Sequence, residues 1–132
     1  MNDLLNLKSA RVLVTGANGF IGSHLVDKLL ASGSTVHGLV RGSSSLKWLD
    51  ASKVHLHQVD LSQADFVVPA LENFDYIFHC AGLTKAKSRS DYFQVNATAC
   101  SNLYEQCQKR GGRIKSIVHL SSLAATGPSP QG

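Results

Sequence analysis

Three glycines that recur every third residue constrain this chain more than any other feature. They follow the run Arg11 to Thr15, R-V-L-V-T, which is short, apolar and β-branched and therefore predicts a buried strand. The stretch from Phe20 to Ser32 carries apolar residues at helical spacing, and Gly33 predicts the end of that helix. The glycines are Gly16, Gly19 and Gly22, in the segment T-G-A-N-G-F-I-G. The sequence therefore predicts a β-α unit with a glycine-rich turn.

The β-α alternation continues along the chain. Further strands are predicted at 35–40, 54–59, 76–80 and 114–120, and helices at 46–49, 63–71 and 91–110. Residues 127–132 predict a loop. Alternating strands and helices with right-handed crossovers predict an α/β fold, a doubly wound parallel sheet with strand order 3-2-1-4-5. We expect residues 1–132 to form one such domain, truncated after the fifth strand.

Composition excludes several other classes of protein. The chain has 132 residues, 43% of them hydrophobic and 17% charged, which is typical of one globular domain. Its net charge of +4 comes from scattered Lys and Arg residues, so we expect no nucleic-acid surface. No apolar stretch has the length of a signal peptide or a membrane span, which predicts a cytoplasmic protein that does not enter a membrane. The three cysteines and six histidines are spread out, and no metal site is expected.

The glycine-rich turn predicts a ligand with phosphate groups. Gly16 permits a tight turn after the strand, Gly19 lets the backbone approach a pyrophosphate, and Gly22 allows close packing of the helix on the sheet. The free N–H groups and the positive dipole of the helix then face the phosphates. No Gly-Lys-Ser/Thr follows, which disfavours ATP or GTP hydrolysis. The predicted contacts are Gly16, Asn18, Gly19, Phe20, Ile21 and Gly22.

The chain resembles the extended short-chain dehydrogenases/reductases, the epimerase/dehydratase group. The resemblance rests on T-G-A-N-G-F-I-G and on four later motifs in the family's order: Asp60-Leu61, His79-Cys80-Ala81-Gly82, Val95-Asn96 and Ser121-Ser122. It implies a Rossmann fold that binds NAD or NADP and an enzyme that transfers hydride. It also implies cofactor contacts at Asp60, Leu61, Cys80, Ala81, Gly82, Asn96 and Ser121, and a catalytic hydroxyl at Ser122.

The end of the second predicted strand favours NADP over NAD. NAD-binding members of the family carry an Asp there, whereas this chain has Val40 followed by Arg41. A guanidinium suits a 2′-phosphate, and Lys47 is predicted to add a second charge. The alternative is an exposed Arg41 that pairs only with solvent, and NAD then stays open.

Part of the family's catalytic machinery does not occur in these residues. The resemblance implies a Tyr-x-x-x-Lys pair, but Tyr76, Tyr92 and Tyr104 are followed at that spacing by Cys80, Asn96 and Gln108. We therefore expect the N-terminal part of a longer enzyme, without its substrate lobe and inactive alone. A homodimer is also expected, because it would cover the edge of the last strand.

Two functions remain open from the sequence. The first is an oxidoreductase or epimerase/dehydratase that transfers hydride between a nicotinamide cofactor and a small molecule, either a carbonyl/alcohol or a nucleotide-sugar. The second is a non-catalytic NADP-sensing regulator or assembly factor, which the absence of Tyr-x-x-x-Lys would suit.

Overall fold

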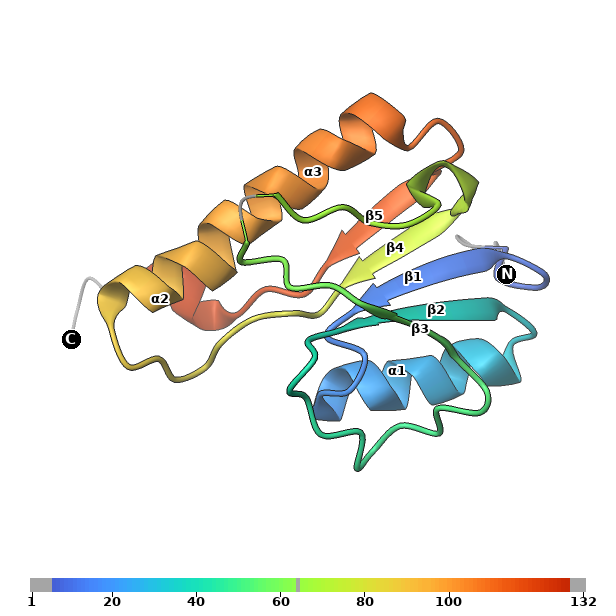
Figure 1. The fold of residues 1–132 in the computed structure, drawn as a ribbon, viewed down its shortest axis with the longest axis horizontal. Helices are drawn as coiled ribbons and strands as arrows, with labels where there is room; N and C mark the ends of the chain where they lie inside the picture. Colours follow the sequence, from blue (N-terminus) through green and yellow to red (C-terminus); the bar gives the residue numbers. More distant parts are fainter. Residues whose placement is uncertain (1–5, 64, 129–132) are drawn as a thin grey trace.

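The computed structural model describes residues 6–63 and 65–128. Within them, five strands alternate with helices (Figure 1). The strands are β1 (Arg11–Thr15), β2 (Thr35–Val40), β3 (His55–Gln58), β4 (Tyr76–His79) and β5 (Ser116–His119). The α-helices are α1 (Phe20–Ala31), α2 (Arg89–Phe93) and α3 (Ala99–Arg110), and the short 3₁₀ turns are η1 (Leu71–Asn73) and η3 (Leu123–Thr126).

All strand pairs of the sheet are parallel, in the order β3-β2-β1-β4-β5. This confirms the predicted doubly wound fold. The order reverses between β1 and β4, so the loops that follow these two strands diverge at the carboxyl edge of the sheet. Ligands of open α/β sheets bind at such a switch point.

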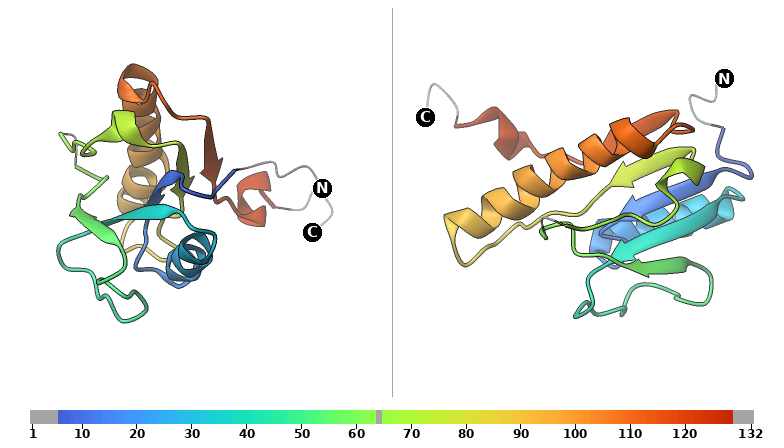
Figure 2. Two further views of the ribbon diagram at one scale, coloured as in Figure 1. Left: turned by 90° about the vertical axis from the view of Figure 1, so that its right-hand side faces the viewer. Right: turned by 45° about the horizontal axis from the view of Figure 1, so that its top comes forward.

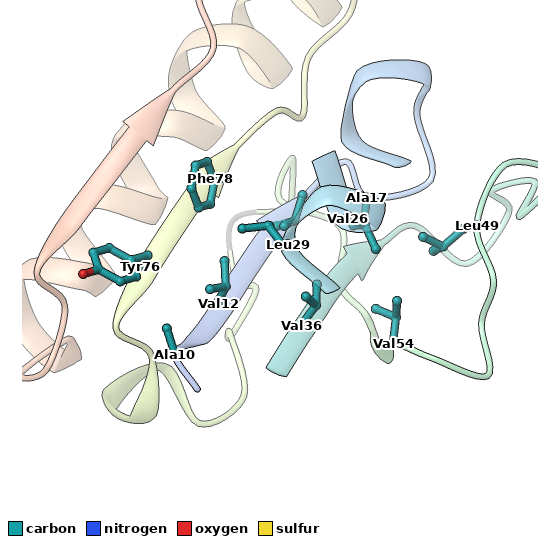
Figure 3. Packing of buried hydrophobic residues seen from close by; sticks show 11 residues of the cluster. Ala10, Val12, Ala17, Val26, Leu29, Val36, Leu49, Val54, Tyr76 and Phe78 are labelled. Carbon is teal, nitrogen blue, oxygen red and sulfur yellow. The ribbon is translucent and has the colours of Figure 1, made fainter. Parts of the chain in front are cut away.

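Each face of the sheet packs against different helices (Figures 1 and 2). On one face, α1 contributes Val26 and Leu29 to a core with Val12, Val36 and Phe78 of the strands (Figure 3). On the other face, α3 packs Leu103 against residues such as Leu13 and Ile77. Strictly alternating strand residues thus enter opposite cores, which explains why β1 reads as a continuous apolar run.

Two predicted helices are wrong. Residues 46–49 form a turn, in which Leu49 is buried while Leu46 and Trp48 are exposed, so a helix there would have no apolar face to bury. Residue 63 and residues 65–70 form turns and irregular backbone before η1, with Phe66 and Val68 buried on either side of an exposed Val67.

Contacts with α3 explain why the second of these predicted helices does not form. The side chain of Gln106 accepts from the Val68 amide at 3.3 Å and donates to the Phe66 carbonyl at 2.7 Å. The guanidinium of Arg110 donates to the Val68 carbonyl at 3.2 Å. These contacts satisfy the backbone without a local helix.

The long helix predicted at 91–110 is confirmed in outline, but it is not uniform. It begins at Arg89 and includes a π-helical turn, η2 (Gln94–Thr98), before α3. Ser88 caps its start by accepting from the Asp91 amide at 3.1 Å, and Gly111 follows its end. A π turn of this kind shifts the helical phase by one residue and is frequent at functional sites.

After β5 the chain leaves the body of the domain (Figure 2). Residues 119–128, including η3, are all exposed, and Leu123 is 89% exposed. The predicted loop at 127–132 lies mostly outside the described residues. No helix in the described part of the chain is both long enough and apolar enough to span a membrane.

Candidate functional site

The protein itself requires glycine at two positions of the β1–α1 turn. Gly16 has φ +64°, and a Cβ there would lie 2.9 Å from the backbone of Ala81. A Cβ at Gly22 would lie 2.1 Å from the Gly16 carbonyl oxygen. The turn therefore packs closely against both the segment after β4 and the first turn of α1, as the sequence predicted for Gly16 and Gly22.

Gly19 is less restricted by the protein than Gly16 and Gly22 are. Its backbone is extended (φ −72°, ψ 171°), a conformation open to any residue. A Cβ at this position would lie 3.3 Å from the Gly16 carbonyl oxygen, a tight contact but a longer one than at Gly16 or Gly22. Glycine at this position also keeps the turn open to close approach by a ligand.

The N-terminus of α1 lacks the partners that usually satisfy it. Gly19 is the N-cap residue, no side chain caps the helix, and the first turn contains no acidic residue. The first amide groups of a helix need acceptors from outside the helix and carry its positive dipole end. Within the described residues, this end of α1 is thus a site for an anion.

A pocket opens beside this helix end, at the carboxyl edge of the sheet. It is lined from five segments: the β1–α1 turn, the end of β2 with the loop after it, the residues after β3, the turn after β4, and η2. The lining residues are Gly16, Asn18, Gly19, Leu39, Val40, Arg41, Ser44, Val59, Asp60, Leu61, Ser62, Cys80, Ala81, Gly82, Leu83 and Val95.

Asn18 joins two of these segments. Its side-chain amide donates to the Ser45 carbonyl at 3.1 Å, which ties the glycine turn to the loop after β2. That loop begins with Arg41, which is exposed and forms no ion pair within the described residues. The pocket therefore has a free guanidinium at one end and an uncapped helix terminus in its middle.

Asp60 supplies the pocket's carboxylate. The hydroxyl and the amide of Ser62 both donate to its Oδ1, at 2.6 and 2.9 Å. These hydrogen bonds hold the pKa of Asp60 below its ordinary value, and the charge of Arg41 contributes weakly in the same direction. Asp60 is thus ionised near neutral pH and available as a hydrogen-bond acceptor.

The turn after β4 is held by polar contacts from two sides. The Ala81 amide donates to Thr15 Oγ1 at 3.1 Å. Farther along, Asn96 on η2 accepts from the Leu83 amide at 2.7 Å and donates to the Leu83 carbonyl at 2.9 Å. Asn96, which was predicted as a cofactor contact, does not line the pocket but fixes a segment that does.

His79 continues the contact network beneath this turn. Its Nδ1 lies 2.7 Å from Thr15 Oγ1, and its Nε2 lies 2.9 Å from Cys100 Sγ. Burial, with a smaller effect of His119, lowers the pKa of His79 to about 4, so the ring is neutral near pH 7.

The other predicted contacts lie outside the pocket lining. Phe20 and Ile21 project from the first turn of α1 and are 67% and 54% exposed. The ammonium of Lys47 lies over the Trp48 ring, 4.6 Å from its centroid, rather than beside Arg41. Ser121 and Ser122 follow β5 and are exposed; the Ser122 hydroxyl accepts from the Ala124 amide at 3.2 Å and so caps η3.

Sequence reasoning missed some of the lining. Ser44 and Ser62 contribute hydroxyl groups, and Leu83 and Val95 contribute apolar surface. Ser62 had a usable signal, since a Ser two residues after an Asp commonly closes a turn on that carboxylate. Leu83 and Val95 had none, because only the packing of the helical segment η2 onto the turn after β4 brings them to the pocket.

The sheet order, the glycine turn and the pocket together define a dinucleotide-binding domain of the Rossmann type. The residues fit such a cofactor: the helix terminus is uncapped, and the N-cap residue Gly19 has no side chain that would block a pyrophosphate.

Comparison with known proteins agrees with this class of domain and also identifies the family. The family model "NAD dependent epimerase/dehydratase family" matches residues 12–132, and the chain belongs to this family.

Two curated relatives show how far the likeness extends. Sterol demethylase protein B of Methylococcus capsulatus is 34% identical over 91% of this chain and 37% of its own length. The 2-alkyl-3-oxoalkanoate reductase of Shewanella oneidensis is 31% identical over 94% of this chain and 31% of its own length. The chain thus spans about a third of the length of these relatives.

A solved structure shows the same fold with ligands. MoeE5 in complex with UDP-glucose and NAD superposes with a TM-score of 0.75 at 31% identity, covering 91% of this chain and 39% of that one. The likeness to proteins of this family supports a nicotinamide dinucleotide as the cofactor.

Proposed function

We propose that this chain is the cofactor-binding part of an oxidoreductase and that its pocket holds a nicotinamide dinucleotide. The single observation that carries this proposal is the uncapped N-terminus of α1, which opens at Gly19 into a pocket shared with Arg41 and Asp60. The α1 amides would bind the pyrophosphate, Asp60 would accept from the adenine, and Cys80, Ala81 and Gly82 would flank the remainder. When bound, the nicotinamide donates or accepts hydride.

Within this proposal, NADP is the preferred cofactor. Arg41 follows β2, lines the pocket and has no carboxylate partner in the described chain, so a 2′-phosphate would be its partner. Lys47 is the weaker part of the prediction, because its ammonium lies over Trp48.

Calorimetric titration with NADP and NAD tests this assignment. Arg41→Ala should weaken NADP binding by about 10- to 100-fold, since a hydrogen bond to a charged group contributes about 1.5–3 kcal/mol. Its effect on NAD should be small. Lys47→Ala is the matched control for a nearby positive charge and should change NADP affinity less. Equal losses of NADP and NAD affinity in Arg41→Ala would rule out the 2′-phosphate contact.

For the complete enzyme we propose hydride exchange with a carbonyl or alcohol. Two relatives carry the names of a sterol demethylase protein and an oxoalkanoate reductase, which favours this class. A nucleotide-sugar stays the second choice, because MoeE5 was solved with UDP-glucose. The Ser122 hydroxyl would donate its hydrogen to the substrate oxygen, while its oxygen can still accept from the Ala124 amide.

Turnover assays separate these possibilities. We expect the 132 residues alone to bind cofactor without turnover, because they contain no Tyr-x-x-x-Lys pair to exchange the proton. NADPH oxidation by these residues with a ketone would contradict that expectation. In a longer protein that carries the pair, Ser122→Ala should lower kcat by about 10²-fold or more without lowering cofactor affinity.

A non-catalytic NADP-binding regulator is the second candidate, and it applies only if the full-length protein also lacks the Tyr-x-x-x-Lys pair. It predicts cofactor binding as tight as in the enzyme but no dehydrogenase, reductase or epimerase activity in the full-length gene product.

A further inference from the structure

Four polar side chains converge on the face of the sheet that α3 covers. His79 on β4 and His119 on β5 are register partners in a parallel pair, so both rings point to the same face. Cys100 and Tyr104 lie one turn apart on α3 and meet these rings. No local sequence pattern indicates this cluster, because its members come from three elements.

The contacts within the cluster are short. His79 Nε2 lies 2.9 Å from Cys100 Sγ, and the rings of His79 and His119 have centroids 5.2 Å apart. Tyr104 donates its hydroxyl hydrogen to, or accepts one from, Nδ1 of His119. One donor atom each from His79, Cys100 and His119 can be chosen so that all three lie within 4.8 Å of one another.

We propose that His79, Cys100 and His119 bind a divalent ion of the zinc class. Two imidazoles and one thiolate are donors typical of zinc and cobalt, and they disfavour magnesium and calcium. Three protein ligands would leave a fourth position for water or another small ligand.

The geometry needs only a small adjustment. In a tetrahedral zinc site with Zn–S near 2.3 Å and Zn–N near 2.0 Å, donor atoms lie roughly 3.3–3.8 Å apart. His79 Nε2 and Cys100 Sγ would therefore move apart by roughly half an ångström. The ligating nitrogen of His119 would move toward them by roughly one ångström. His79 and Cys100 are 1% and 8% exposed and form a rigid pair, while His119 is exposed and can both move and admit the ion.

The hydrogen bonds of the cluster define the proton balance of ion binding. Ala81 N–H donates to Thr15 Oγ1, and we assign the two His79 contacts from Cys100: a thiol that donates to a carbonyl accepts from His79 Nε2–H, which leaves Nδ1 to accept from Thr15. The Cys100 thiol in turn donates to the Asn96 carbonyl at 3.3 Å.

When the ion binds, the His79 proton moves from Nε2 to Nδ1 and Thr15 becomes its acceptor. Such a contact to the outer nitrogen is the usual support of a metal-bound histidine. The Cys100 thiol releases one proton and becomes the thiolate ligand. One proton therefore leaves for each ion that binds, and affinity should rise with pH.

Titration of the reduced chain with cobalt(II) tests the proposal. Cobalt gives a thiolate-to-metal charge-transfer absorption only when a cysteine ligates it. We expect this absorption to saturate at one ion per chain and to be displaced by zinc. Cys100→Ser should abolish it. Cys107→Ser should leave it unchanged, and it is a matched control because Cys107 is an equally buried thiol on the same helix.

A second variant tests the site without changing the buried Cys100 thiol. His119→Asn alters an exposed side chain and should weaken cobalt binding at least tenfold, whereas His24→Asn, another exposed histidine, should not. Circular dichroism checks that each variant is folded. Absence of the absorption in the wild type, or its equal loss in Cys107→Ser, would overturn the proposal.

Discussion

Gly16 and Gly19 stand three residues apart in one turn, but the protein restricts them differently. Gly16 has a positive φ, and a Cβ there would lie 2.9 Å from the Ala81 backbone, whereas Gly19 has an ordinary conformation and a Cβ there would lie 3.3 Å from the Gly16 carbonyl oxygen. The fold therefore restricts Gly16 more strongly, and in our proposal the ligand adds a second reason for glycine at Gly19. The two glycines should therefore respond differently to substitution by alanine.

Gly19→Ala should leave stability within about 0.5 kcal/mol of wild type but lower NADP affinity by about tenfold or more, because the methyl group would occupy the approach of the pyrophosphate. Gly16→Ala should instead lower the free energy of unfolding by about 1–3 kcal/mol. Urea denaturation and calorimetry measure the two quantities. A Gly19→Ala variant that binds NADP like wild type would remove the pyrophosphate from this turn.

His37 predicts a pH dependence of stability. It lies between the Arg11 guanidinium at 3.3 Å and His57, with 2.8 Å between His37 Nδ1 and His57 Nε2, and His55 stacks on its ring. Burial above all, then the charges of His55, Arg11 and His57, lowers the pKa of His37 from 6.5 to about 4. The folded state therefore resists a proton that the unfolded chain accepts.

The stability that depends on neutral His37 is complete above pH 6.5 and is lost as the pH falls toward about 4. The loss should reach at most about 3 kcal/mol. His37→Phe keeps an aromatic ring beside Phe74 and should reduce the pH dependence of the unfolding free energy in this window, leaving the part that His79 contributes. The matched substitution His24→Phe, at an exposed ring, should leave the wild-type slope unchanged. An unchanged slope in His37→Phe would contradict the assignment.

At the scale of elements, Asp75 ties three strands together at the edge of the sheet opposite the pocket. It precedes β4, and its Oδ2 accepts from the Arg11 amide of β1 at 2.9 Å. Its Oδ1 lies 3.0 Å from Arg113 and 3.7 Å from Lys115, both on the segment that leads into β5. The Arg11 amide first, and then Arg113 and Lys115, hold the pKa of this carboxyl below its ordinary value.

Asp75→Asn should lower the free energy of unfolding at neutral pH by about 1–3 kcal/mol, because it removes the charge that these donors surround. Asp50→Asn, at an exposed carboxylate paired with Lys53, should have little effect. Chemical denaturation compares them. The cost of Asp75→Asn should vanish in acid, where the wild-type carboxyl is itself protonated, and a cost that persists there would point to packing instead of charge.

At the scale of the whole molecule, a cofactor that binds only the folded state must stabilise it. At a free NADP concentration 100 times its Kd, the free energy of unfolding should rise by about 2.7 kcal/mol. Thermal unfolding with and without NADP measures this gain, and the same NADP concentration should stabilise Gly19→Ala less. A gain of equal size in Gly19→Ala would place the cofactor elsewhere.

The homodimer stays a prediction. Within the described chain β5 ends the sheet, and Val118 and Leu120 are 41% and 46% exposed beside it. An open strand edge with apolar neighbours favours pairing with a second copy. Light scattering should give twice the mass of the chain, and a single-chain mass at all concentrations would contradict the dimer.

The amino-acid sequence alone was enough to predict those strands, helices and turns that depend on residues close together in the chain. The apolar runs of β1 and β2, the helical spacing of α1 and the glycine turn each depend on residues close in the chain, and all are confirmed. The parallel order of the sheet follows from this alternation and from crossover handedness. Arg41 could be predicted at the pocket from its place at the end of the second strand, and Asp60 from the family resemblance.

Tertiary structure alone decided the features that depend on packing between distant segments. Phe66 and Val68 lie outside any helix because Gln106 and Arg110 of α3 satisfy their backbone groups, a contact that no local pattern encodes. Strand register and the phase of α3 likewise bring His79, Cys100 and His119 together. Local periodicity thus determines which segments become strands and helices, while register and helix phase determine which side chains meet.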